Sequence, residues 1–273
     1  MLKTAKYLGT LVLVATAAWS LFCGPARADE SVPPIRALLV TGGGWHDFEA
    51  QKTIIAEGVS ERIHTEWTLD YEARRRNDFE PTRFQDEDWI EPFDVVLYSI
   101  GIGRMPVERQ KDLTDRIADA HRETGVPAIF IHNALHFGRQ VDRWHEFTGL
   151  TSRRHTSNRP RTLRNLAPDH PIMRDFGETW KPVTVELYLV EDVSSGITPL
   201  ADCDDEEGRS HITYWTHQYG DAPVFGTTIG HDNRAVADPV FLDTMARGIL
   251  WATGKLDDDG NPLPEYNRSL DSQ

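Results

Sequence analysis

The stretch Ala37-Leu-Leu-Val-Thr-Gly-Gly-Gly-Trp-His-Asp-Phe48 decides the fold. Its run Leu38–Val40 is short and wholly apolar, which is the pattern of a strand buried on both faces. The glycines at 42–44 end this run, and a helix-compatible segment follows them. Strand, glycine loop and helix form the opening unit of an open α/β sheet. Such sheets bind their ligands at the carboxyl ends of the strands.

The first residues predict export. Lys3 and Lys6 precede an apolar run that ends at Phe22, and Ala26-Arg27-Ala28 is the small-x-small pattern that signal peptidase reads. We therefore expect residues 1–28 to be cleaved and the protein to be periplasmic or secreted. The remaining 273 − 28 = 245 residues suffice for one α/β domain. We expect a linker at 29–34, the domain at 35–254, and a disordered polar tail at 255–273.

The charge of the chain excludes several classes of partner. The net charge is −14, and removal of three basic residues with the leader makes it −14 − 3 = −17. A surface this acidic repels nucleic acid and anionic lipid, so we expect neither nucleic acid nor, after cleavage, a membrane as partner. A neutral carbohydrate is compatible with it. Cys203 would be the single remaining cysteine, so no intrachain disulfide is expected.

Apolar runs and helical periodicities alternate along the chain, which indicates a mainly parallel sheet. Further strands are expected at 65–69, 93–100, 128–131, 183–190, 211–216 and 224–229. Gly220-Asp221 favours a hairpin between the last two strands. The clearest helix begins at Pro239, after a capping Asp238, and ends before Gly254. The arginine-rich segment 153–164 is interpreted as a solvated face.

Imidazoles and carboxylates follow several of these strands. Because the ends of parallel strands share one edge of the sheet, we expect these side chains to meet there. Four histidines and three carboxylates stand at such positions or within a strand: His46, His132, His136 and His231, with Asp47, Glu186 and Asp232. Each residue alone is weak evidence, since a histidine beside a strand end is more often structural.

Three chemistries compete for this cluster. Thiol catalysis is disfavoured, because the turn 131–134 lacks cysteine and acidic neighbours of Cys203 suppress its thiolate. No cofactor is certain, but a divalent metal is possible; its candidate ligands are His132, His136, His231 and Glu186. General acid–base catalysis by histidine–carboxylate pairs is the third. Trp45 and Tyr188 could offer flat apolar surfaces to a sugar ring, although core packing explains them equally well.

Several motifs, in this order, resemble the ThuA-like (trehalose utilisation) family. They are Val40-Thr-Gly-Gly-Gly-Trp-His-Asp47, His132-Asn-Ala-Leu-His136, His170-Pro-Ile172, Glu186-Leu-Tyr188, Thr228-Ile-Gly-His-Asp232 and Arg247-Gly-Ile-Leu-Trp-Ala-Thr-Gly254. The resemblance implies a class I glutamine amidotransferase-like, flavodoxin-like three-layer sandwich without the amidotransferase nucleophile. It also implies a role in using trehalose and related disaccharides through 3-keto sugars, made by partner oxidoreductases. Val185 replaces an aspartate common in the family, and the turn at 220–223 lacks its usual basic residues.

Our leading hypothesis is an exported protein that acts on a 3-keto glycoside by acid–base chemistry. The predicted catalytic residues are His46, His132, His136, His231 and Glu186, and the predicted substrate-binding residues are Trp45, Asp47, Asn133, Tyr188 and Asp232. Two alternatives are a non-catalytic carbohydrate-binding or accessory protein and a metal-dependent hydrolase.

Overall fold

The computed structural model of the chain describes residues 32–72, 81–101 and 105–268. The predicted signal peptide at 1–28 and residues 29–31 of the predicted linker at 29–34 lie outside these residues. Among the residues described, no helix combines the length and the apolar character that crossing a membrane would require.

A nine-stranded sheet forms the centre of the domain, in the order β2-β1-β3-β4-β11-β10-β9-β6-β7. Five neighbouring strands are parallel: β2 (Thr65–Glu72), β1 (Ile35–Gly43), β3 (Val95–Gly101), β4 (Ala128–Ile131) and β11 (Ala222–Thr227). Four strands extend the sheet in antiparallel fashion: β10 (Ser210–Tyr219), β9 (Thr198–Asp204), β6 (Leu163–Asn165) and β7 (Thr179–Trp180). A separate antiparallel pair joins β5 (Leu150–His155) to β8 (Tyr188–Val193).

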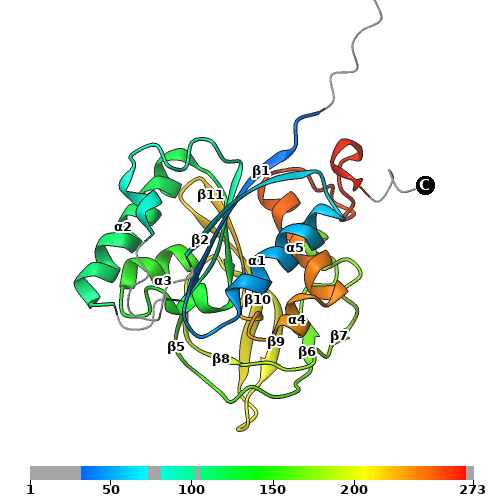
Figure 1. Cartoon of the computed structure of the whole chain (residues 1–273). Helices are drawn as coiled ribbons and strands as arrows, with labels where there is room; N and C mark the ends of the chain where they lie inside the picture. The colour runs from blue at the N-terminus through cyan, green and yellow to red at the C-terminus, as the bar shows by residue number, and fades with distance from the viewer. Residues whose placement is uncertain (1–31, 73–80, 102–104, 269–273) are drawn as a thin grey trace, which may run out of the picture. The chain divides into compact units, whose positions relative to one another are not determined.

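Helices cover both faces of the parallel part of the sheet, so the expected three-layer α/β architecture is confirmed (Figure 1). One layer holds α1 (Phe48–Ser60), α4 (Asn233–Val236) and α5 (Pro239–Ala252), and the other holds α2 (Val107–Thr124) and α3 (Asp142–Thr148). Helix α5 starts as predicted, because Asp238 accepts a hydrogen bond from the amide of Val240 and Pro239 occupies the first turn.

Strand β1 is the buried strand that its sequence predicts. Leu38, Leu39 and Val40 have no solvent exposure. The glycine at 43 is required at the end of this strand, because its φ is +89° and an added Cβ would lie 1.9 Å from the carbonyl oxygen of Gly101. The same close approach keeps β1 and β3 in register where the two strands end, at Gly43 opposite Gly101.

The tail beyond residue 254 is ordered as far as residue 268, contrary to the expectation of disorder. Leu256 and Pro262 form a β-bridge, and a 3₁₀ turn, η4, spans Pro264–Tyr266. Tyr266 is buried, and its carbonyl accepts a hydrogen bond from the amide of His64. The polar composition of the segment concealed this single aromatic anchor.

The arginine-rich segment 153–164 is also more than a solvated face. Its guanidinium groups pair with acidic residues at the end of β9 and in the loop after it: Arg164 with Asp202 and Asp204 of the strand, and Arg161 with Glu206 of the loop. Arg161 is buried, with a side chain only 6% exposed. The pairing is non-local, which is why a reading of the segment alone missed it.

We predict that buried His121 makes the protein less stable in acid. Its Nδ1 donates to the carbonyl of Val126 at 2.6 Å and its Nε2 accepts from the hydroxyl of Tyr98 at 2.7 Å, so the ring is neutral in the fold. Burial lowers the pKa of His121 to about 4, against 6.5 in an unfolded chain. The contribution of neutral His121 to the free energy of unfolding is therefore fully present above pH 6.5. About 3 kcal/mol of it is lost as the pH falls toward 4.

Denaturant unfolding of wild type and His121→Gln between pH 7 and pH 4 measures this loss. The glutamine amide can serve both partners but cannot titrate, so the variant should lack this component of the pH dependence. Identical pH slopes for the two proteins would contradict the prediction.

Candidate functional site

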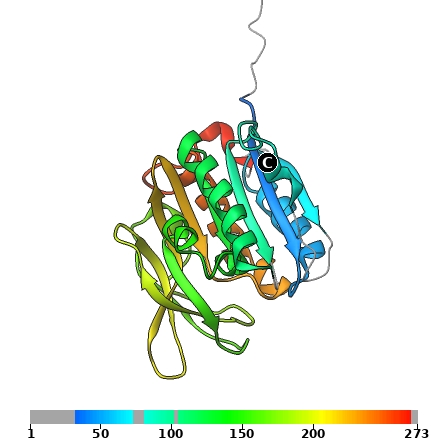
Figure 2. The same ribbon diagram turned by 90° about the vertical axis from the view of Figure 1, so that its left-hand side faces the viewer.

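The parallel register brings three loops together at the carboxyl edge of the sheet. In Figure 2 the arrowheads of the blue and teal strands, β1 and β3, point to the same lower edge. Strand β4 ends at Ile131, which pairs with Thr227 at the end of β11. The next residues of both strands, His132 and Thr228, are therefore adjacent, and the loop after β1 lies beside them.

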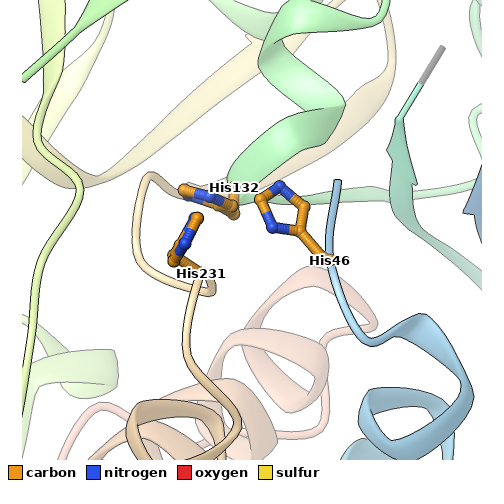
Figure 3. Close-up of side chains that lie close together, drawn as sticks. All are labelled: His46, His132 and His231. Atoms are coloured by element: carbon orange, nitrogen blue, oxygen red, sulfur yellow. The ribbon is translucent and has the colours of Figure 1, made fainter. Parts of the chain in front are cut away.

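Three imidazoles from these loops face one another: His46 after β1, His132 after β4 and His231 after β11 (Figure 3). The ring centroid of His46 lies 4.7 Å from that of His132 and 4.8 Å from that of His231. One nitrogen from each ring lies within 4.8 Å of one nitrogen of the other two. The structure thus brings together three of the four histidines that the sequence singles out.

The backbone fixes which nitrogen of His132 carries a proton. Its Nδ1 lies 2.6 Å from the carbonyl oxygen of Thr228, which can only accept, so Nδ1 is the protonated donor. In the neutral ring Nε2 is then a bare lone pair. His132 has a φ of +49°, unusual for a residue with a side chain, and this conformation turns the ring inward. Gly230 makes room, since an added Cβ there would lie 2.7 Å from Cβ of His132.

Glu186 lies against two of these rings. Its Oε2 is 3.4 Å from Nε2 of His132 and 3.4 Å from Nδ1 of His231. Neither nitrogen makes a hydrogen bond within the described part of the chain, and Nδ1 of His46 is likewise buried without a partner. A carboxylate facing the bare lone pair of His132 is unfavourable unless a positive charge lies near both.

The electrostatics of the cluster separate its members. Burial and the neighbouring imidazoles of His132 and His231 lower the pKa of His46 to about 3. The adjacent Glu186 carboxylate raises the pKa of His231. Burial alone would raise the pKa of Glu186, but the proximity of His132 and His231 outweighs it and holds that pKa well below its usual value. Glu186 is therefore an anion and His46 a neutral imidazole at pH 7.

These features fit a divalent cation held by His46, His132 and His231. Metal-bound histidines usually donate their other ring nitrogen to a carbonyl or carboxylate, as His132 does to Thr228. Three imidazoles are a ligand set typical of Zn²⁺, which binds histidine in its deprotonated, neutral form. Among the described residues, Glu186 is the only carboxylate that pairs with two of these three histidines, His132 and His231.

His136 does not join this cluster, although it was predicted as a catalytic residue and metal ligand. Its ring stacks on Tyr188 at 4.0 Å, and its Nε2 lies 3.2 Å from the hydroxyl of Ser152. Tyr188 in turn lies between His136 and His132, with its centroid 4.7 Å from that of His132. The ring of Tyr188 is 1% exposed, so it supports the histidines and offers no open face to a sugar. His136 follows His132 by four residues in η2 (His132–His136), a 3₁₀ helix, in which residues four apart do not align.

Asp47 and Asp232, predicted to bind substrate or orient imidazoles, each cap a helix. Asp47 accepts from the amide of Ala50 at the start of α1 and from the side-chain amide of Asn233. Asp232 accepts from the amide of Arg234 and pairs with its guanidinium. An aspartate just before a helical segment is a common capping signal, which the sequence interpretation did not weigh here.

The remaining predicted residues lie at the edge of the site. Trp45 is 53% exposed, has a φ of +90°, and precedes His46. The side-chain amide of Asn133 packs on Gly101, where an added Cβ would lie 2.1 Å from its nitrogen. Glu186 lies just before β8 rather than within a strand, because the strand pairing begins at Tyr188.

Sequence reasoning missed His155, whose Nδ1 lies 3.2 Å from Oε1 of Glu186. This histidine ends β5, opposite Tyr188 at the start of β8. Its place depends on an antiparallel pairing between distant segments, and its arginine neighbours suggested only a charged surface.

Comparisons with known proteins place the chain in one family. The ThuA family model, described as trehalose utilisation, matches residues 36–252. A protein named as ThuA-like from Parabacteroides merdae is 18% identical with a TM-score of 0.65, covering 86% of this chain and 97% of its own. Another from Bacteroides uniformis is 13% identical with a TM-score of 0.59, covering 88% and 99%. A β-galactosidase from Halorubrum lacusprofundi is 13% identical with a TM-score of 0.51, covering 82% of this chain and 31% of its own. No curated protein matches the sequence.

We predict that His46 stays neutral from pH 8 to pH 5 in cation-free protein, because its pKa lies at about 3. His231 should take up its proton at a higher pH than an exposed histidine, since the Glu186 carboxylate stabilises the charged ring. Histidine ring resonances followed by NMR across this range, with His46→Ala and His231→Ala for assignment, test both statements. A His46 ring that titrates near pH 6.5 would show that the cluster is open to water.

Proposed function

Given that this chain belongs to the ThuA trehalose-utilisation family, we propose that it is an enzyme that acts on an oxidised, 3-keto glycoside. His46, His132 and His231 hold a divalent cation in this enzyme, and the residues around Glu186 donate and accept protons. The acid–base and the metal-dependent hypotheses are combined here, because the same histidines belong to both candidate sites.

The observation that carries the proposal is the 3.4 Å approach of Nε2 of His132, which makes no hydrogen bond among the described residues, to Oε2 of Glu186. Thr228 fixes the tautomer, so the ring cannot turn a proton toward the carboxylate without becoming charged. A divalent cation satisfies the lone pair and the carboxylate together. The unpartnered Nδ1 atoms of His46 and His231 support the same reading.

The chemistry divides between the cation and the chain. When bound, a divalent cation supplies Lewis acidity that polarises a carbonyl oxygen of the substrate. His132 keeps its orientation through Thr228, and Glu186 remains an anion beside the site. A keto sugar has acidic C–H bonds next to its carbonyl, so proton abstraction there is the reaction class that such a site suits best.

A carbohydrate is the proposed substrate class for two reasons. The family is described as trehalose utilisation. The exposed indole of Trp45 adjoins His46 at the edge of the site, where an apolar ring face could stack on a sugar. The buried Tyr188 takes no part in this contact.

We predict that the purified protein binds one Zn²⁺ or similar divalent ion per chain. Elemental analysis after purification without chelator, followed by chelation and calorimetric titration with Zn²⁺, measures this. His132→Ala and His231→Ala should each weaken binding by more than about 10²-fold, beyond the loss typical of outer hydrogen-bonding partners.

His64→Ala is the matched control, because His64 precedes β2 at the opposite edge of the sheet. Its affinity for Zn²⁺ should equal that of wild type. Binding that survives both site variants would place the ion elsewhere and remove the metal from the proposal.

We also predict turnover of 3-keto-trehalose by the zinc-loaded protein. His132→Ala and His231→Ala should each lower kcat/KM by at least about 10²-fold, the scale of a lost charge-stabilising group, while the melting temperature stays near that of wild type. Product formation followed by NMR gives the rates. Sugar binding without any turnover would instead identify a non-catalytic carbohydrate-binding protein.

A further inference from the structure

His155 lies on the solvent-exposed side of the site. Glu186 separates it from the three histidines His46, His132 and His231. Its side chain is 46% exposed, against 12% for Glu186 and 3% for His132. Glu186 uses its two oxygens differently: Oε2 faces His132 and His231, and Oε1 faces Nδ1 of His155. The carboxylate thus links the buried imidazoles to an exposed one.

The tautomer of His155 is fixed by its surroundings. Nδ1 lies 3.2 Å from Oε1 of Glu186 and 3.0 Å from the carbonyl oxygen of Thr156, and both atoms can only accept. Nδ1 is therefore the donor, and Nε2 is left as the reactive nitrogen. Nε2 makes no hydrogen bond within the described residues.

Backbone pairing holds this arrangement rigidly. The amide of Thr156 donates to the carbonyl of Leu187, and the amide of Leu187 donates to the hydroxyl of Thr156. Arg159 and Val185 exchange two backbone hydrogen bonds. Segment 155–159 and segment 185–188 therefore form one wall that presents His155 and Glu186 together. A carboxylate and a carbonyl that orient an imidazole are the arrangement expected of a proton-transfer residue.

We propose that His155 is a catalytic residue that moves protons to and from the substrate through Nε2, with Glu186 and Thr156 orienting its ring. This inference rests on the proposed function, since it supplies the base for proton abstraction from a keto sugar. It assigns Glu186 a positioning role toward His155, in addition to its contact with the metal-site histidines.

The proposed step is an enolisation of the keto sugar. The C–H bond next to the carbonyl breaks and its proton passes to Nε2 of His155. The C–H electron pair forms a carbon–carbon double bond, and a carbonyl electron pair moves onto oxygen. The proton then returns to carbon; alternatively, the carbonyl re-forms, the enol electron pair makes a new double bond between the deprotonated carbon and the glycosidic carbon, the C–O pair leaves with the glycosidic oxygen, and that oxygen takes the proton.

Exchange of the substrate's α-hydrogen with D₂O measures this step alone. Zinc-loaded wild type, His155→Gln and His155→Ala are incubated with 3-keto-trehalose and followed by NMR. Both variants should slow exchange by at least about 10²-fold, the lower end of the contribution of general acid–base catalysis. Their Zn²⁺ content and melting temperature should equal those of wild type. Because the ring is half exposed, added imidazole should restore exchange to His155→Ala but not to His132→Ala.

His64→Gln serves as the control and should exchange at the wild-type rate. An active His155→Gln, or a His155→Ala that imidazole fails to rescue, would overturn the role of His155 while leaving the proposed function intact. A zinc-loaded wild type that exchanges no deuterium would overturn both. In the free protein, ¹⁵N shifts should show His155 with its proton on Nδ1; a proton on Nε2 would also overturn the assignment.

Discussion

The hydrogen bond from Nδ1 of His132 to the carbonyl of Thr228 is the interaction on which the site depends. It exists because β4 and β11 are parallel neighbours whose last residues, Ile131 and Thr227, pair directly. The sheet register thereby fixes the orientation of the ring: Nδ1 is the donor to Thr228, and Nε2 faces the half-buried carboxylate of Glu186. A shift of this register would separate His132 from Thr228 and leave its tautomer unset.

The glycines around the site serve the same purpose of close approach. Gly43 lets β1 end against β3, and Gly230 leaves space for the inward-turned His132. The amide of Gln51, on α1, donates to the carbonyl of Gly230 and ties the late loop to the first helix. Strained conformations at Trp45 and His132 concentrate in the same place, each at a cost of about 1–3 kcal/mol. The surrounding parallel strands are rigid enough to hold that strain.

The sequence was sufficient to predict the fold class and most of the inner cluster. Strand ends can be read from apolar runs, and parallel strands put their ends on one edge, so His46, His132 and His231 could be placed together. His136 lies outside the cluster, because residues four apart do not align in the 3₁₀ helix that holds it and His132. Asp47 and Asp232 each cap a helix, and a capping aspartate follows a strand in the same way as one that binds substrate, so the sequence does not separate the two roles. His155 could not be found, because pairing of β5 with β8 leaves no local signal.

The ordered segment 255–268 changes where the domain ends. The family match stops at residue 252, yet Asn267 bridges to Ile63, and the amide of Arg268 donates to the carbonyl of Arg62. Tyr266 is buried, and its carbonyl accepts from the amide of His64, the residue before the edge strand β2. A chain truncated at residue 252 would leave the amide of His64 without its acceptor and expose the first residues of β2.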